Sequence, residues 1–140
     1  MSKKPKNAKK RTSASAANQP LAVLYHLDSG TQRGDAVRTV LADQGIRAKT
    51  IAESQLANPV GAVVGMTGMR MSSASFEGEV PEGEFMLLHN ISSSRMNTLL
   101  AAMREAGCSV GCKAQVTQHN RLWPFATLIR EVSREHAALS

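Results

Sequence analysis

Aromatic residues are scarce in this sequence. They make up 4% of its 140 residues, with one Tyr and one Trp, and only Tyr25 and Phe85 fall in the long apolar segments. Domains that read single-stranded RNA on a β-sheet stack the bases on aromatic side chains of their central strands. We therefore do not expect that kind of RNA recognition. No apolar run approaches the ~20 residues that a membrane helix needs, so we expect a soluble protein.

Catalytic and metal-binding motifs are also missing. There is no glycine-rich phosphate loop and no Ser or Cys nucleophile with an evident base, which indicates a protein that is not an enzyme. Cys108 and Cys112 are four residues apart, or ~13 Å in an extended strand, which exceeds the ~7 Å limit for a disulfide. We interpret them as reduced core thiols of a cytoplasmic protein, and we expect no metal and no cofactor.

Acidic residues are absent from the first 20 positions. These positions carry six basic residues, namely Lys3, Lys4, Lys6, Lys9, Lys10 and Arg11. The rest of the chain balances its charges, so this segment accounts for the whole formal net charge of +6. Residues 1–20 are too polar to form a packed core, and we predict a disordered basic tail. Two interpretations stay open: an arm that contacts nucleic acid or the ribosome, or a tail that only keeps the protein in solution.

Residues 21–140 are predicted to form one α/β domain. An apolar strand at 21–27 stops at a polar turn, and a helix capped by Thr31 then runs to Gly45. A second strand covers 46–52. These elements make a strand-helix-strand unit.

The same order of elements occurs again in the second half. A strand at 84–90 is followed by a helix that Ser92 or Ser93 caps and Gly107 ends, and then by a strand at 110–117. The half-repeats are 21–52 and 84–117, with His26 aligned over His89 and Thr31 over Ser93.

Two further helices lie outside the repeat. A short one is expected to begin near Pro59, before a connecting loop at 69–83. A longer one at about 123–138 has an apolar stripe that consists of Phe125, Leu128, Ile129 and Val132. This last helix is expected to pack on a sheet edge or on part of an uncovered sheet face.

The side-chain pattern of the strands favours a ferredoxin-like sheet. Even-numbered residues from Cys108 to Val116 are expected to point inward and their odd-numbered neighbours outward, which is typical of a half-covered edge strand. The apolar strands then lie in the middle, so we predict an α+β sandwich with a βαββαβ ferredoxin-like topology. A small doubly wound α/β sheet is the alternative. In the antiparallel arrangement His26 and His89 lie at opposite ends of the sheet and cannot share a metal.

Polar side chains gather around the end of the last predicted strand. The candidate binding residues are Lys113, Thr117, Asn120 and Trp123, together with Arg47 and Lys49, which we expect on the same side of the sheet. Lys113 and Thr117 could donate hydrogen bonds to an anionic ligand or nucleic acid, and Trp123 could stack on a base. Alternatively, Asn120 caps a turn and Trp123 seats the last helix.

This C-terminal stretch resembles the small prokaryotic family catalogued as domain of unknown function 3783. The residues that carry the resemblance are Lys113-Ala114, Thr117, Asn120, Trp123, Leu128, Glu131 and Glu135-His136, with weaker support from Gly61, Gly65 and Gly68. The likeness spans roughly residues 21–139. The chain departs from it at Gln118 and Pro124, where the family usually has Pro and a helix-capping residue. The resemblance implies a stand-alone domain of the prokaryotic cytoplasm and supplies no activity.

Three functional hypotheses follow. The first is a non-enzymatic binding or regulatory domain whose basic tail contacts nucleic acid or the ribosome. The second is a sensor of an anionic small molecule that forms a homodimer through an open sheet face. An enzyme built on Lys113, Thr117 and His119 is a third and weaker hypothesis.

Overall fold

The computed structural model describes residues 19–139, so almost all of the predicted basic tail lies outside the described residues. The first half contains β1 (Leu21–Tyr25), α2 (Gln32–Asp43), β2 (Arg47–Thr50), the 3-10 helix η2 (Glu53–Gln55) and α3 (Val60–Val63). The second half contains β3 (Phe85–His89), α4 (Ser93–Ala106), β4 (Lys113–Gln115), the 3-10 helix η3 (Asn120–Leu122) and α5 (Phe125–Leu139). The predicted order of strands and helices is confirmed.

The helix boundaries lie where the sequence signals placed them. The Thr31 hydroxyl accepts a hydrogen bond from the Gly34 N–H at 3.0 Å and caps α2. The Ser92 hydroxyl accepts from the Arg95 N–H at 3.3 Å and caps α4. Gly107 ends α4 with a φ of 73°, a left-handed conformation that glycine adopts at little cost. The strands are shorter than predicted, because the edge strands pair over only three or four residues.

The sheet order is β2-β1-β3-β4, and the predicted ferredoxin-like topology is not confirmed. The apolar strands β1 and β3 lie in the middle as expected, and they run antiparallel. However, β2 pairs in parallel with β1, and β4 pairs in parallel with β3. A ferredoxin-like sheet instead pairs each edge strand with the central strand of the other half. Each half is therefore a complete βαβ unit, whose crossover helix returns the chain to the neighbouring strand.

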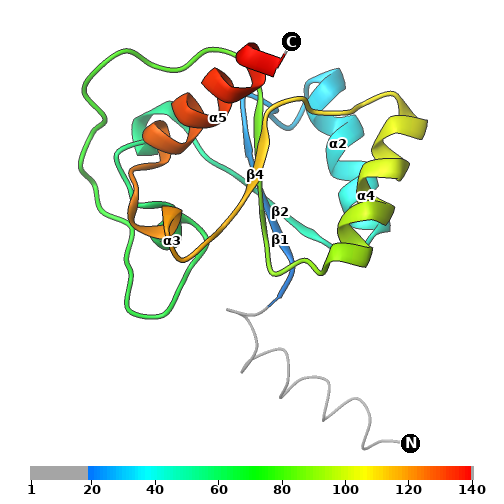
Figure 1. Cartoon of the computed structure of the whole chain (residues 1–140), viewed down its shortest axis with the longest axis horizontal. Helices are drawn as coiled ribbons and strands as arrows, with labels where there is room; N and C mark the ends of the chain where they lie inside the picture. Colours follow the sequence, from blue (N-terminus) through cyan, green and yellow to red (C-terminus); the bar gives the residue numbers. More distant parts are fainter. Residues whose placement is uncertain (1–18, 140) are drawn as a thin grey trace, which may run out of the picture.

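Helices cover both faces of the sheet, which corrects the expectation of a half-covered sheet. Figure 1 shows the sheet nearly edge-on, with α2 and α4 on one side and α3 and α5 on the other. Each side has its own core. Ala22, Leu24, Met86 and Leu88 belong to the α2–α4 core, whereas Leu21, Val23, Phe85 and Leu87 belong to the α3–α5 core. The face expected to serve for dimerisation is thus covered.

The alternation from residue 108 to 116 does not follow one face. Cys108 and Val110 pack in the α2–α4 core, whereas Cys112 and Ala114 pack against the α3–α5 core. The chain bends at residues 111–112, before β4 begins, and this bend carries the even-numbered side chains to the other side of the sheet. The two-residue alternation therefore continues along the sequence, but after the bend the same set of side chains points to the opposite face of the sheet.

The two halves of the internal repeat resemble each other more in structure than in sequence, and the residues that correspond differ from those of the sequence alignment. β1 and β3 begin 64 residues apart, at 21 and 85, so His26 corresponds to Asn90 and not to His89. Both residues have a positive φ, 59° and 60°. Thr31 likewise corresponds to Ser92, since these two residues cap the equivalent helices.

The repeat also extends beyond the two βαβ units. In each half a 3-10 helix, a proline and an α-helix follow the edge strand. Pro59 and Pro124 face each other in an antiparallel bridge. The Val60 N–H donates to the Trp123 carbonyl at 2.8 Å, and the Phe125 N–H donates to the Asn58 carbonyl at 2.9 Å. The short α3 is therefore the counterpart of α5, and the two are joined at their first turns.

Candidate functional site

The predicted site residues do not form one surface. Lys113 pairs with Met86 and lies on the α2–α4 side of the sheet. Arg47 pairs with Leu21, and Lys49 with Val23, on the α3–α5 side. β2 and β4 are also the two opposite edges of the sheet. The expectation that these three cations share a side is wrong, because the bend before β4 reverses the side-chain phase on which it depended.

Thr117 and Asn120 bind each other. The Thr117 N–H donates to Asn120 Oδ1 at 2.9 Å, and the Asn120 N–H donates to Thr117 Oγ1 at 2.9 Å. Asn120 Nδ2 also donates to the Gln115 carbonyl at 3.0 Å, and the residue is 7% exposed. These bonds hold the turn between β4 and η3, in agreement with the interpretation that Asn120 caps a turn.

Trp123 contributes to the junction between α3 and α5. Its half-buried ring packs against the α3–α5 core and meets the ring of His119 edge to face, with the centroids 5.3 Å apart. The backbone carbonyl of Trp123 accepts the Val60 N–H at 2.8 Å. These contacts agree with a residue that seats the last helix.

A cavity of about 300 Å³ lies along β2 and is referred to as the β2 cavity. Its lining consists of Gln19, Leu21, Arg47, Lys49, Val63, Val64 and Gly65. The lining contains two cations and no carboxylate. Lys49 Nζ donates to the Val63 carbonyl at 2.7 Å. Burial, with the charge of Arg47 as a smaller cause, lowers the pKa of Lys49, and no carboxylate in the lining counteracts this shift.

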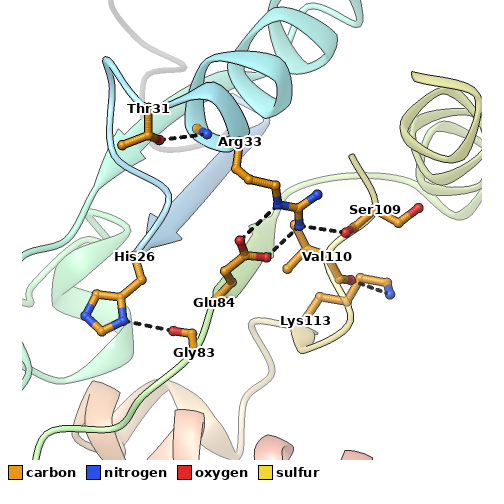
Figure 2. Close-up of polar contacts among 9 residues, drawn as sticks. His26, Thr31, Arg33, Gly83, Glu84, Ser109, Val110 and Lys113 are labelled. Atoms are coloured by element: carbon orange, nitrogen blue, oxygen red, sulfur yellow. Dashed lines mark hydrogen bonds and ion pairs between the residues drawn. The ribbon is translucent and has the colours of Figure 1, made fainter. Parts of the chain in front are cut away.

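A second cavity, of about 210 Å³, lies between α4 and the start of β4 and is referred to as the β4 cavity. Leu100, Met103, Arg104, Ser109, Val110 and Lys113 line it. Again two cations and no carboxylate contribute. Lys113 Nζ donates to the Val110 carbonyl at 3.0 Å, as Figure 2 shows. An ammonium has three donors, so two remain for a ligand or water.

An ion pair between the two halves holds one wall of the β4 cavity. Arg33 Nε donates to Glu84 Oε2 at 3.0 Å, and Nη2 donates to Oε1 at 2.6 Å. The same Nη2 donates to the Ser109 carbonyl at 2.9 Å. Figure 2 shows the guanidinium between the Glu84 carboxylate and the Ser109 backbone. This planar fork links α2, the start of β3 and the loop before β4. The sequence pattern gave no sign of it.

His26 lies at the end of β1 and His89 at the end of β3. Because β1 and β3 are antiparallel, the two histidines lie at opposite ends of the sheet, as expected. His26 Nδ1 is 2.9 Å from the Gly83 carbonyl, and Nε2 is 2.8 Å from Glu53 Oε2. Burial lowers the pKa of His89. Within residues 19–139, no three His, Cys, Asp or Glu side chains are grouped as metal ligands would be.

No helix in the described part of the chain has the length and apolar character that crossing a bilayer requires.

One comparison with known proteins supports the resemblance that the C-terminal residues indicated. No curated protein and no solved structure matches the chain. Residues 84–139 match the family described as Domain of unknown function (DUF3783), which confirms the resemblance over β3 to α5, the second half of the internal repeat.

Proposed function

We propose that this chain is a non-enzymatic nucleic-acid-binding domain that contacts the phosphate backbone through the β2 cavity and the basic N-terminal segment. The observation that carries the proposal is the composition of the β2 cavity. Arg47 and Lys49 line it without a carboxylate, and a cationic site of this kind suits phosphate groups.

Gln19 connects this cavity to the basic segment along the sequence. Gln19 lines the β2 cavity, and the six basic residues lie at positions 3 to 11 of the same chain. Arg11, the last of these six residues, lies eight positions before Gln19 in the sequence. Together, the six cations of the segment and the two of the cavity favour a polyanion over a small anion, because each phosphate that is neutralised releases counterions.

The two cations of the cavity differ in how they would hold phosphate. The Arg47 guanidinium has no hydrogen-bond or ion-pair partner among residues 19–139, and its fork geometry matches two phosphate oxygens. Lys49 is a point charge whose ammonium is held by the Val63 carbonyl. A phosphate between them would also favour the protonated form of Lys49, since an opposite charge raises the pKa that burial lowers.

The test is a titration of the full-length protein with a fluorescent duplex DNA at several salt concentrations. Eight phosphate contacts predict a log–log salt slope of about −7, at about 0.9 per phosphate. Replacing the six basic tail residues by Gln leaves a slope of about −2, and Arg47→Gln with Lys49→Gln reduces the original slope by about 2. A single-stranded RNA probe run in parallel shows which nucleic acid is preferred.

The control is Arg70→Gln, which removes one positive charge from the exposed loop after α3, outside the cavity lining. It should leave the slope near that of the unmodified chain. Equal slopes for the Arg47/Lys49 double variant and the unmodified chain would remove the β2 cavity from the interface. The absence of binding at low salt would disprove the proposal as a whole.

A further inference from the structure

We propose that the β4 cavity is a separate site for a small phosphate-type oxyanion, held by Lys113, Arg104 and Ser109. The cavity does not depend on the nucleic-acid interface, because it lies on the other face and at the other edge of the sheet. Its volume of about 210 Å³ is below the ~300–1,000 Å³ of sites that enclose drug-sized ligands. A phosphate group, free or as the end of a small ester, suits this size.

The donors of the site come from three elements. Arg104 lies in the last turn of α4, Lys113 begins β4, and Ser109 lies in the loop between them. A guanidinium, an ammonium and a hydroxyl can together satisfy a tetrahedral oxyanion. Leu100, Met103 and Val110 form the apolar part of the lining. Apolar walls exclude water and strengthen the attraction between the cations and an anion.

The charges around the cavity favour an anion. The carbonyl end of α4 contributes a negative partial charge, which Arg104 offsets from the last turn. Glu105 lines a different hollow, which it shares with Thr98, Ala101, Ala102 and Arg104. The Glu84 carboxylate, which is linked to the loop through Arg33, accepts two hydrogen bonds from that guanidinium. No carboxylate lines the β4 cavity itself, so a bound anion would meet both cations of its lining.

The loop that carries Ser109 is held in place before a ligand arrives. Arg33 donates to the Ser109 carbonyl, and Lys113 donates to the Val110 carbonyl. Figure 2 shows both bonds on the same short loop. A loop fixed in this way loses little conformational entropy when it binds a ligand.

The test uses inorganic phosphate and the full-length protein. Isothermal titration calorimetry at constant ionic strength should show saturable binding, and the backbone amide signals of Ser109 and Val110 should shift in NMR spectra. Arg104→Met should weaken binding about tenfold, the effect of losing one charge-assisted hydrogen bond. This exposed residue has no partner among residues 19–139, so the variant should fold normally. Lys113→Met should weaken binding at least as much.

Arg70→Met is the matched control and should bind phosphate like the unmodified chain. A ribose monophosphate and a 5′-phosphorylated oligonucleotide distinguish a small metabolite from a nucleic-acid end as the source of the phosphate. The proposal is overturned if phosphate gives no saturable heat up to about 10 mM, a range that would detect millimolar affinity. It is also overturned if Arg104→Met and Lys113→Met bind as well as the unmodified chain, or if binding is lost only in the Arg47/Lys49 double variant.

Discussion

Tyr25 illustrates how one buried polar atom links stability to pH. The side chain is fully buried, and its hydroxyl donates to the Pro81 carbonyl at 2.7 Å. Burial, with a smaller contribution from the charge of Glu53, raises the pKa of Tyr25 to about 12. An unfolded chain titrates near 10. The stabilisation of the folded state by the protonated Tyr25 hydroxyl is therefore complete below pH 10 and is lost as the pH rises through 12.

We expect Tyr25→Phe to cost about 1 kcal/mol at neutral pH, the net contribution of one hydrogen bond. The difference in unfolding free energy between the unmodified chain and the variant should shrink between pH 10 and 12. Urea unfolding at each pH measures it. Lysines titrate in the same window in both proteins, so the comparison isolates Tyr25. A difference that stays constant up to pH 12 would contradict the assignment.

Asn120 is expected to be a structural residue of the turn after β4. Its side chain accepts a hydrogen bond from the Thr117 N–H and donates one to the Gln115 carbonyl, its own N–H donates to Thr117 Oγ1, and the residue is 7% exposed. We expect Asn120→Ala to lower the unfolding free energy by about 2–3 kcal/mol, because it removes two part-buried hydrogen bonds, those with the Thr117 N–H and the Gln115 carbonyl. Gln118→Ala, an exposed change in the same turn, should cost less than about 0.5 kcal/mol. Equal costs would show that the hydrogen bonds contribute little.

The sequence pointed to Asn120 and Lys113 as residues of interest but could not give their partners. A short polar residue after a strand indicates a turn, and this part of the interpretation holds for Asn120. The partner of Lys113 is a backbone carbonyl. Because every residue has one, the sequence does not show which carbonyl a side chain will bind. The same applies to His26, whose bond to the Gly83 carbonyl joins positions 57 residues apart.

At the scale of single elements, the helix ends were the most predictable part of the fold. Thr31, Ser92 and Gly107 end their helices through contacts within a few residues of the chain, so these ends can be predicted without knowing the tertiary structure. We expect Gly107→Ala to cost about 1 kcal/mol, since Gly107 has a φ of 73°. A Cβ at this position would meet no atom within 4 Å, so the cost should come from the backbone alone. Thermal unfolding of Gly107→Ala and Gly107→Asn measures it.

Asparagine tolerates the left-handed conformation better than alanine does. Gly107→Asn should therefore cost less than Gly107→Ala. The reverse order would mean that side-chain packing, not backbone conformation, decides the effect at this position.

The pairing of the edge strands was not predictable from side-chain phase. Phase says which residues of β4 share a side, but not whether β4 lies next to β1 or β3. The repeat itself was the better guide, because a strand, a helix of 12 to 14 residues and a second strand commonly close as a parallel βαβ unit. The near-continuous apolar sequences of β1 and β3 were the other clue, since such strands are usually covered on both faces.

At the scale of the whole molecule, the two halves should unfold together. β1 and β3 are neighbours in the middle of the sheet, and each core contains residues of both halves. Leu99 is fully buried in the α2–α4 core, and Trp123 packs on the opposite side of the sheet. We expect Leu99→Ala to cost about 2–5 kcal/mol and to lower the urea midpoint of Trp123 fluorescence.

The urea transition seen by Trp123 fluorescence is compared with the transition seen by far-UV circular dichroism, which reports on every helix. Both probes should give one transition with the same midpoint, in the unmodified chain and in Leu99→Ala. A Trp123 transition that stays in place while the circular dichroism signal moves would show that the two cores unfold independently.

The matching left-handed residues at positions 26 and 90 have a consequence for how the sequence can vary. Each follows a central strand, and their φ values differ by one degree. A backbone in this region disfavours Val, Ile and Thr far more than Gly, Asn or Asp. A saturation mutagenesis library selected for folding should therefore yield nearly the same ranking of accepted amino acids at both positions. Any excess preference for histidine at position 26 would measure what the imidazole adds beyond the turn.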